Sequence, residues 1–258
     1  MKRLKYWAVI DARRLAALHE RLPAWFAREG RPLPWRRTRD PYAIVVSEIL
    51  LHQTTVATVT PVYERFMLRF PTVADLAEAP LREVKAITDP LGYKVRGAWL
   101  SAIARVVVEE WAGHFPDSLE DLMALPGVGR YTAGAVLSFA YGRPAGILDT
   151  NVARVLARLF RVSSEPGGAE RLHRLWALAE AVVPENDAWQ FNQALMDLGA
   201  TVCRARKPSC LACPLADLCP SRGLAMEAAA SNDPDGVMFW ERPKEKRGRQ
   251  ADTASLLA

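Results

Sequence analysis

The stretch LPGVGRYTAGAV, residues 125–136, decides the fold of this chain. Its two glycines, Gly127 and Gly129, flank one small apolar residue and separate two segments with helical spacing. A tight turn of this kind lets backbone N–H groups approach an anion, and the N-terminus of the next helix adds partial positive charge. The stretch therefore predicts either a phosphate-binding turn between two helices or an ordinary helix-helix turn.

Helical spacing continues on both sides of this turn. Over residues 94–111, apolar side chains recur at steps of three and four and form one buried face. The same spacing predicts helices over 10–26, 42–54, 56–70, 131–141, 151–160, 169–183 and 189–202. Strand-like alternation is absent, and prolines and glycines interrupt the pattern, so we expect an all-α protein of about ten short helices.

Composition indicates a folded globular protein. The chain has 258 residues, of which 50% are hydrophobic, with a net charge of +5. No window approaches the roughly 18 apolar residues of a membrane span, and the N-terminus has no cleavage site typical of a secretory signal. The excess of positive charge favours polyanionic partners without deciding among them. After Gly223 the composition becomes polar and predicts a flexible tail.

All the cysteines lie in one short segment: Cys203, Cys210, Cys213 and Cys219. Clustering of this kind indicates a metal site rather than a disulfide framework. The intervals hold six, two and five residues, with a single C-x-x-C pair, whereas zinc knuckles usually have two such pairs. The uneven spacing favours a 4Fe-4S cluster over zinc. We expect the cluster to brace the loop. The first interval holds three basic residues: Arg204, Arg206 and Lys207. They would either offset the charge of the cluster or of DNA phosphates, or simply be solvated loop charges.

The order of motifs resembles the helix-hairpin-helix (HhH-GPD) superfamily of DNA glycosylases, which includes endonuclease III and MutY. The resemblance covers residues 33–219 and rests on LPWRRTRDPY, VSEILLHQT, LGY, LPGVGRYTAGAV, ILDTNVARVL, FNQALMDLGA and the cysteine quartet. It implies a two-lobed, all-α fold with DNA bound across the cleft. One lobe would be a six-helix domain of residues 35–146. The other would join 1–34 to 147–223 and carry the cluster, with a flexible tail over 224–258.

The resemblance also implies which residues perform the reaction. Members that cut both base and backbone have a lysine after the hairpin, which forms a Schiff base with the sugar. Tyr131 stands at that position here, so we expect hydrolysis by water with weak or absent strand cleavage. The carboxylates of the hydrolytic members match Glu48 and Asp149, with Asn151 beside the aspartate.

Two carboxylates suit the breaking of an N-glycosidic bond, because positive charge builds on the sugar and negative charge on the departing base. Asp149 is expected to be ionised, to stabilise the sugar cation and to place water, with plain N-capping as the alternative. Glu48 lies among isoleucine and leucine, so burial would raise its pKa and let it pass a proton to the base. The alternative for Glu48 is a solvent-facing charge on an amphipathic helix.

The target base must leave the helical stack before it can be cut, so side chains must fill or hold open the gap. The resemblance assigns the plug to Gln53 and the wedge in the opposite strand to Leu91 and Tyr93. Core packing is the alternative for Leu91 and Tyr93. The expected DNA contacts at the hairpin are Gly127, Gly129, Arg130 and Thr132.

Two kinds of relative compete over the excised base. The chain resembles adenine glycosylases, which act opposite 8-oxoguanine or guanine, in the motifs VSE, HQT, LGY and FNQALMDLGA. It resembles thymine or uracil glycosylases, which act on G/T or G/U mismatches, in TRDPYAI, EILL and Tyr131. Thr150 and His52 depart from the usual patterns, and we expect no room for the Nudix-like domain of adenine enzymes. We favour adenine.

A DNA-binding module without catalysis, whose cluster senses redox state, is the remaining hypothesis. The combination of Glu48, Tyr131, Asp149 and Asn151 in one chain argues against it. The expected partner is double-stranded DNA with a mismatch or an oxidative lesion. We further expect no membrane association, a monomer, and a cytoplasmic, nucleoid-associated location of the prokaryotic type.

Overall fold

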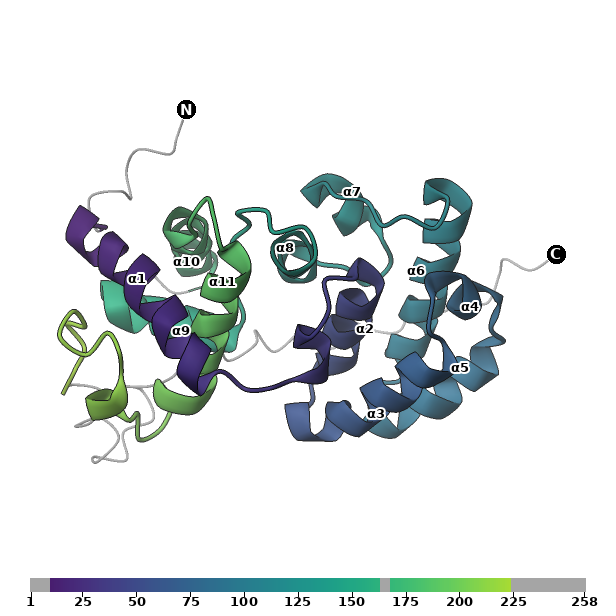
Figure 1. Ribbon diagram of the computed structural model, residues 1–258, viewed down its shortest axis with the longest axis horizontal. Coiled ribbons are helices and arrows are strands. Elements are labelled where there is room, and N and C mark those ends of the chain that lie inside the picture. Colours follow the sequence, from purple (N-terminus) through teal and green to yellow (C-terminus); the bar gives the residue numbers. More distant parts are fainter. Residues whose placement is uncertain (1–9, 163–167, 224–258) are drawn as a thin grey trace.

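A computed structural model describes residues 10–162 and 168–223 (Figure 1). Within these ranges the regular elements are α-helices with short 3-10 and π segments, and no strand occurs among them. The all-α prediction is confirmed. No helix in these ranges combines the length and apolarity that crossing a bilayer requires. The predicted tail, 224–258, lies outside the described residues.

Residues 35–146 contain seven α-helices where we expected six. They are α2 (Pro41–Leu51), α3 (Val56–Arg69), α4 (Val73–Glu78), α5 (Leu81–Thr88), α6 (Val95–Trp111), α7 (Leu119–Ala124) and α8 (Arg130–Phe139). Short 3-10 turns precede α2 at Pro34–Arg36 and α6 at Asp89–Leu91. Helix α2 begins at the N-cap Asp40, and residues 42–50 are all buried. A polar side chain on α2 is therefore surrounded by apolar groups.

The second lobe consists of α1 (Ala12–Glu29), α9 (Thr150–Phe160), α10 (Ala169–Val182) and α11 (Ala188–Asp197). Figure 1 shows α1 alongside α11, and the two helices pack together. The helix predicted over 189–202 is α-helical only to Asp197 and continues as a π-helix, Leu198–Val202. The π segment coincides with a carbonyl group at Gly199 that accepts a hydrogen bond from Arg154 on α9.

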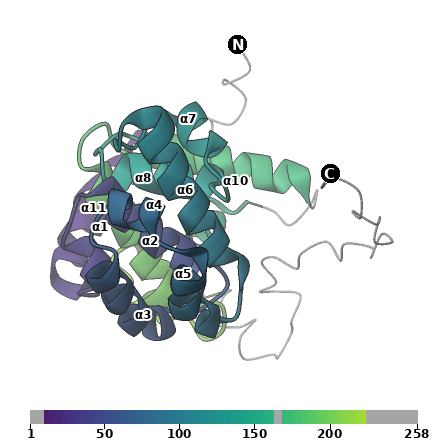
Figure 2. The same cartoon turned by 90° about the vertical axis from the view of Figure 1, so that its right-hand side faces the viewer.

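Helix α8 joins the two lobes, because it packs against α2 on one side and α11 on the other (Figures 1 and 2). Asn192 on α11 donates to Ser138 Oγ on α8 and to the carbonyl oxygen of Ala145, both at 2.9 Å. A Cβ on Gly134 would lie 2.7 Å from the carbonyl oxygen of Gly146. The chain leading into α9 therefore crosses directly over α8.

Candidate active site at the junction of the lobes

Glu48 lies on the innermost helix, α2, and is 4% exposed. Its pKa is raised from the ordinary 4.5 to about 7, first by burial and then by the charge of Asp149. A hydrogen-bonding interaction with Tyr131 and the charge of Arg36 act in the opposite direction. Glu48 is not on a solvent-facing helix surface. Near neutral pH its carboxyl group carries a proton part of the time, as a general acid requires.

Asp149 is the N-cap of α9. Its Oδ1 accepts a hydrogen bond from the Val152 N–H at 2.7 Å, and its Oδ2 accepts one from Asn151 Nδ2 at 2.9 Å. Burial raises the pKa of Asp149 above its ordinary value, although these hydrogen bonds act to lower it. Asp149 therefore both caps α9 and lies close enough to Glu48 to affect its charge.

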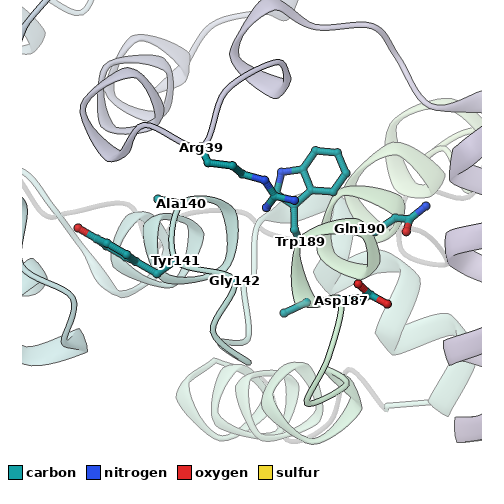
Figure 3. A pocket seen from close by; sticks show the side chains of 8 residues that line it. Arg39, Ala140, Tyr141, Gly142, Asp187, Trp189 and Gln190 are labelled. Carbon is teal, nitrogen blue, oxygen red and sulfur yellow. The ribbon is translucent and has the colours of Figure 1, made fainter.

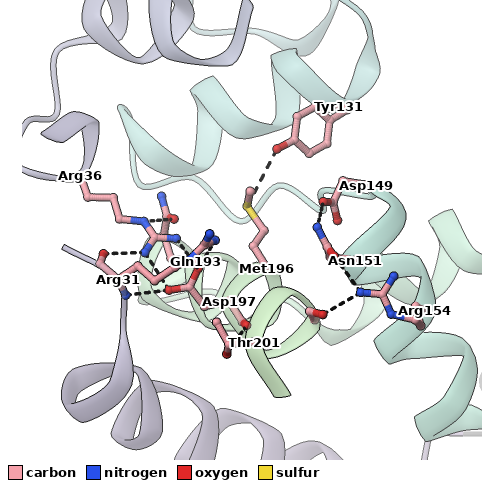
Figure 4. Close-up of polar contacts among 11 residues, drawn as sticks. Arg31, Arg36, Tyr131, Asp149, Asn151, Arg154, Gln193, Met196, Asp197 and Thr201 are labelled. Carbon is pink, nitrogen blue, oxygen red and sulfur yellow. Dashed lines mark hydrogen bonds and ion pairs between the residues drawn. The ribbon is translucent and has the colours of Figure 1, made fainter. Parts of the chain in front are cut away.

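Tyr131 occupies the first turn of α8, directly after the hairpin. Burial and the carboxylates of Glu48 and Asp149 raise its pKa well above the ordinary 10. The hydroxyl lies 3.9 Å from Sδ of Met196 on α11 (Figure 4). A neutral phenol thus lies close enough to interact with both carboxylates.

A buried ionic network that the sequence analysis missed lies next to these groups (Figure 4). Asp197 on α11 has no exposed side-chain surface and accepts hydrogen bonds from Arg36 and Arg31 at 2.7 to 2.9 Å. Burial raises the pKa of Asp197, but the two arginines outweigh burial and hold it below 3.8. Arg36 also donates to Gln193 Oε1 at 2.7 Å. Arg36 and Asp197 are 161 residues apart in sequence, so only the pairing of their two motifs could have indicated the contact.

Arg154 on α9 connects the candidate active site with the cysteine segment. Its Nη2 donates to Asn151 Oδ1 and to the carbonyl oxygen of Gly199, both at 2.7 Å. Its Nε donates to the carbonyl oxygen of Cys203 at 2.8 Å. The position of Asn151, and through it that of Asp149, therefore depends on the chain that begins the cysteine loop. The sequence signal for Arg154 is its place three residues after Asn151, one helical turn away.

The hairpin between α7 and α8 has the geometry that its two glycines predict. Gly127 has φ +74°, and a Cβ there would lie 2.3 Å from Cδ2 of Trp99. Gly129 is the N-cap of α8 without a side-chain cap, and a Cβ there would meet nothing within 4 Å. The uncapped N–H groups at the start of α8 therefore adjoin open space.

The other two expected hairpin contacts are less available. Arg130 forms an ion pair with Glu180 and lies 4.2 Å from the ring centroid of Trp176. Thr132 is 2% exposed, because its side chain points into the core of the α8 packing. The structure thus gives Arg130 a partner within the protein and places the Thr132 side chain away from the surface.

The turns with the expected plug and wedge differ in exposure. Gln53 is exposed and has a left-handed backbone, with φ +54°. Tyr93 is half-buried, and Leu91 is 8% exposed within the core. In this structure Leu91 packs in the core, whereas Gln53 and Tyr93 keep surface that a partner could contact.

The cysteine loop packs on the second lobe through Arg158. Nη1 of Arg158 lies 3.4 Å from Sγ of Cys203. Burial first, and then the other three thiols, raise the pKa of Cys213 to about 11, so the four sulfurs influence one another. No three His, Cys, Asp or Glu side chains within 10–162 and 168–223 are placed to hold a single metal ion. A polynuclear cluster is larger than one ion and accepts more widely separated thiolates.

A cavity of about 510 Å³ lies between the lobes but away from these groups (Figure 3). Its lining includes Arg39, Tyr141, Asp187 and Trp189, and the Arg39 guanidinium lies 4.4 Å from the ring centroid of Trp189. These residues adjoin the N-termini of α2 and α11 and the C-terminus of α8. Glu48, Met196 and Tyr131 are near the other ends of the same helices, so this cavity is not the candidate active site.

Comparison with known proteins agrees with this geometry. Residues 46–181 match the HhH-GPD superfamily of base excision DNA repair proteins. The chain belongs to this family. Residues 203–219 match the iron-sulfur binding domain of endonuclease III. The chain is therefore an HhH-GPD protein with a 4Fe-4S binding segment.

Individual relatives of this HhH-GPD protein fall into two groups. The adenine DNA glycosylase of Homo sapiens is 45% identical over 82% of this chain, which spans only 40% of that relative. The thymine-DNA glycosylase of Aeropyrum pernix is 40% identical over 81% of the chain and 96% of the relative. A thermostable thymine-DNA glycosylase structure has a TM-score of 0.74 at 34% identity, covering 81% of this chain and 96% of that one. A non-covalent endonuclease III–DNA complex has a TM-score of 0.68 at 28% identity, covering 82% and 96%.

The cysteine segment of this HhH-GPD protein fits the cluster that the match indicates. Cys203, Cys210, Cys213 and Cys219 would be its four ligands, and their soft thiolates suit iron-sulfur chemistry. Arg158 also donates to the carbonyl oxygens of residues 204 and 205, at 2.8 and 3.0 Å. Hydrogen bonds from Arg158 therefore hold this loop on α9.

Proposed function

We propose that this protein is a monofunctional DNA glycosylase that hydrolyses the N-glycosidic bond of adenine mispaired with guanine or 8-oxoguanine. The observation that carries the proposal is the meeting of Glu48, Asp149 and Tyr131 at the junction of the lobes. The relatives named adenine DNA glycosylases support the choice of base.

The chemistry assigns each carboxyl group a different task. Glu48, with a pKa of about 7, donates a proton to the departing base and so neutralises the charge that develops there. Asp149, aligned by Val152 and Asn151, faces the sugar, where its negative charge stabilises the oxocarbenium-like centre and helps to place water. The C1′–N bond breaks, water adds to C1′, and the proton that the water loses passes to the carboxylate of Asp149, which leaves a free base and an abasic sugar.

Tyr131 supports hydrolysis rather than strand cleavage. A lysine amine at this position could form a Schiff base with the sugar, whereas a phenol cannot. Its raised pKa keeps the hydroxyl protonated, so it can donate a hydrogen bond to a neighbouring carboxylate. When bound, the 4Fe-4S cluster supplies a cross-link of four thiolates that braces residues 203–219, which hold Arg154 through the Cys203 carbonyl group.

A G/T or G/U mismatch glycosylase is the second candidate. The thymine-DNA glycosylase of Aeropyrum pernix is matched over nearly its whole length, whereas the human adenine relative is matched over 40%. Glu48 and Asp149 serve either base, because both reactions break an N-glycosidic bond. The site chemistry therefore does not separate the two candidates.

Labelled duplexes containing A/8-oxoG, A/G, T/G and U/G test the proposal when each is incubated with cluster-loaded protein and analysed with and without alkali. We expect breaks only after alkali, and fastest with the two adenine mispairs. Faster cutting at T/G or U/G would establish the second candidate. Binding without cleavage of any duplex would favour a non-enzymatic module.

An Asp149→Asn variant serves as the control for this assay. Asparagine keeps the size and can still accept the Val152 hydrogen bond, so the start of α9 should remain folded. Excision should fall by about 10² or more, because the charge facing the sugar is lost, while DNA binding persists. Full activity of the variant would refute the role of Asp149.

We also propose that the protein acts as a monomer on double-stranded DNA in a cytoplasmic, nucleoid-associated location. The uncapped start of α8 and the exposed Gln53 support the DNA partner. Sedimentation of the protein alone and with one duplex tests the stoichiometry. A single protein per mispaired duplex is the expected result.

A further inference from the structure

Arg96, in the first turn of α6, is a fully buried arginine that contacts two separate turns. Its Nη2 donates to the carbonyl oxygen of His52, and its Nη1 donates to that of Tyr93 at 3.3 Å. Its Cζ also lies 5.5 Å from the ring centroid of Tyr93. The His52 carbonyl group belongs to the peptide bond with Gln53. One guanidinium therefore holds the turns of both Gln53 and Tyr93.

This arrangement is costly as a packing device. A buried charge loses hydration, and carbonyl oxygens compensate for this loss less fully than a carboxylate would. Burial lowers the pKa of Arg96, and its Nε atom has no hydrogen-bond partner among the described residues. A leucine or methionine would fill the same space without that cost. The use of an arginine points to a task that depends on the two carbonyl groups.

Trp99, one turn after Arg96 on α6, adds a third segment to the same assembly. Its ring centroid lies 5.9 Å from that of His52 and 5.7 Å from that of Tyr93, both in edge-to-face geometry. The indole also lies so close to the hairpin that a Cβ on Gly127 would be 2.3 Å from it. The start of α6 thus contacts the Gln53 turn, the Tyr93 turn and the hairpin together.

The backbone of Gln53 shows why this support is needed. In the left-handed region the Cβ of a residue other than glycine comes too close to the following carbonyl oxygen, so the conformation is unfavourable. Gln53 has φ +54°, and such a conformation persists only where the surroundings determine it. The hydrogen bond from Arg96 to the preceding carbonyl group supplies that determination.

We propose that Arg96 is a positioning residue for base extrusion, which holds Gln53 and Tyr93 in register with each other and, through Trp99, with the hairpin. The two side chains then enter the duplex together when the hairpin engages the backbone. This inference rests on the proposed function, because only an enzyme that extrudes a base needs the two side chains in register.

The test compares an Arg96→Lys variant with the wild type on an A/G duplex that carries 2-aminopurine beside the target adenine. Unstacking on binding raises the fluorescence, and it is measured in the Asp149→Asn background so that no base is removed. We expect R96K to lose most of this rise and, with Asp149 intact, to lower the single-turnover excision rate by about tenfold. Affinity for a fully paired duplex should stay within about twofold, since hairpin contacts are unchanged.

Three controls separate positioning from folding. Arg105→Lys, on the exposed side of the same helix, should match the wild type. Thermal unfolding and the visible absorbance of the cluster report whether R96K is folded, and Trp99→Phe replaces it as the test variant if it is not. In a Gln53→Ala, Tyr93→Ala background, R96K should have little further effect, because the side chains that it positions are gone.

A folded R96K protein with wild-type fluorescence and excision would overturn the proposal, and so would an undiminished effect in the double-alanine background. The two inferences fail in different ways. If the wild type excises no base from any duplex but R96K still abolishes the fluorescence rise, the positioning role stands and the proposed function falls.

Discussion

At the scale of single residues, the burial of Glu48 disfavours the ionised form of its carboxyl group. The helix that carries it is covered on all sides, so the ionised form lacks hydration and the pKa rises to about 7. The same burial that suits a general acid therefore reduces stability whenever the group is ionised.

The free energy of unfolding should therefore depend on pH through Glu48. Because the folded pKa of Glu48 lies above the ordinary 4.5, its contribution to folding is fully present below pH 4.5 and is lost as pH rises through 7. Glu48→Gln should therefore be more stable than the wild type at pH 8, by on the order of 1 to 3 kcal/mol, and this gain should shrink toward pH 5. Denaturant unfolding at several pH values measures it. A gain independent of pH would contradict the assignment.

Activity should fall with rising pH in the same direction as the Glu48 contribution to stability. Proton donation requires protonated Glu48, so the single-turnover rate should fall as pH rises through about 7. Protonation of Asp149 should produce a second fall on the acid side, and the two apparent pKa values belong to the coupled pair. Glu48→Gln should be slower by about 10² to 10⁴ and lose the alkaline limb. A wild-type rate that increases above pH 8 would exclude Glu48 as the acid.

At the scale of elements, α9 is anchored at both ends of its first two turns. Its N-cap is Asp149, and Arg154 ties it to Gly199 in the π segment and to Cys203. Sequence spacing predicts α9 correctly. The change from α-helix to π-helix at residue 198, at the end of α11, was not predicted. It depends on contact with α9, and hydrophobic periodicity contains no information about that contact.

Gly199→Ala tests the contact. The added Cβ would lie 2.7 Å from Cβ of Asn151, so Asn151 or the π segment must move. We expect excision to slow by about tenfold or more, because Asp149 loses its alignment. Gly113→Ala is the matched control. Its φ of +84° penalises alanine through the backbone rather than through a contact, since its Cβ would meet nothing within 4 Å, and it is remote from α9. Equal excision rates for both variants would show that only stability had changed.

At the scale of the whole molecule, the two lobes are joined by polar contacts as well as by α8. Asp197 on α11 accepts hydrogen bonds from Arg31 and Arg36, which lie on the chain between α1 and α2. The chain crosses here from one lobe to the other, so the network fixes the angle at which it crosses.

Replacing Asp197 by Asn should therefore destabilise the entire protein. Two arginines would remain in a buried site without a counter-charge, a change that costs about 3 to 5 kcal/mol. Because the folded pKa of Asp197 lies below 3.8, its contribution is present at neutral pH and is lost only as pH falls below that value. Calorimetry at pH 7 measures the loss. Asp217→Asn, which removes an exposed ion pair with Arg21, should leave the midpoint nearly unchanged.

The sequence by itself determined the helices and the glycine hairpin, and it predicted the cysteine ligands and the two catalytic carboxylates. Each of these depends on residue types at short, regular spacing, because helices form through contacts between residues three and four apart. The sequence predicted a raised pKa for Glu48, but only the tertiary structure decided its value of about 7, the burial of Leu91 and Thr132, the Arg36–Asp197 pair and the Arg96 contacts. Solvent exclusion and charge interactions depend on neighbours that the fold brings together from distant parts of the chain, and no local pattern records them.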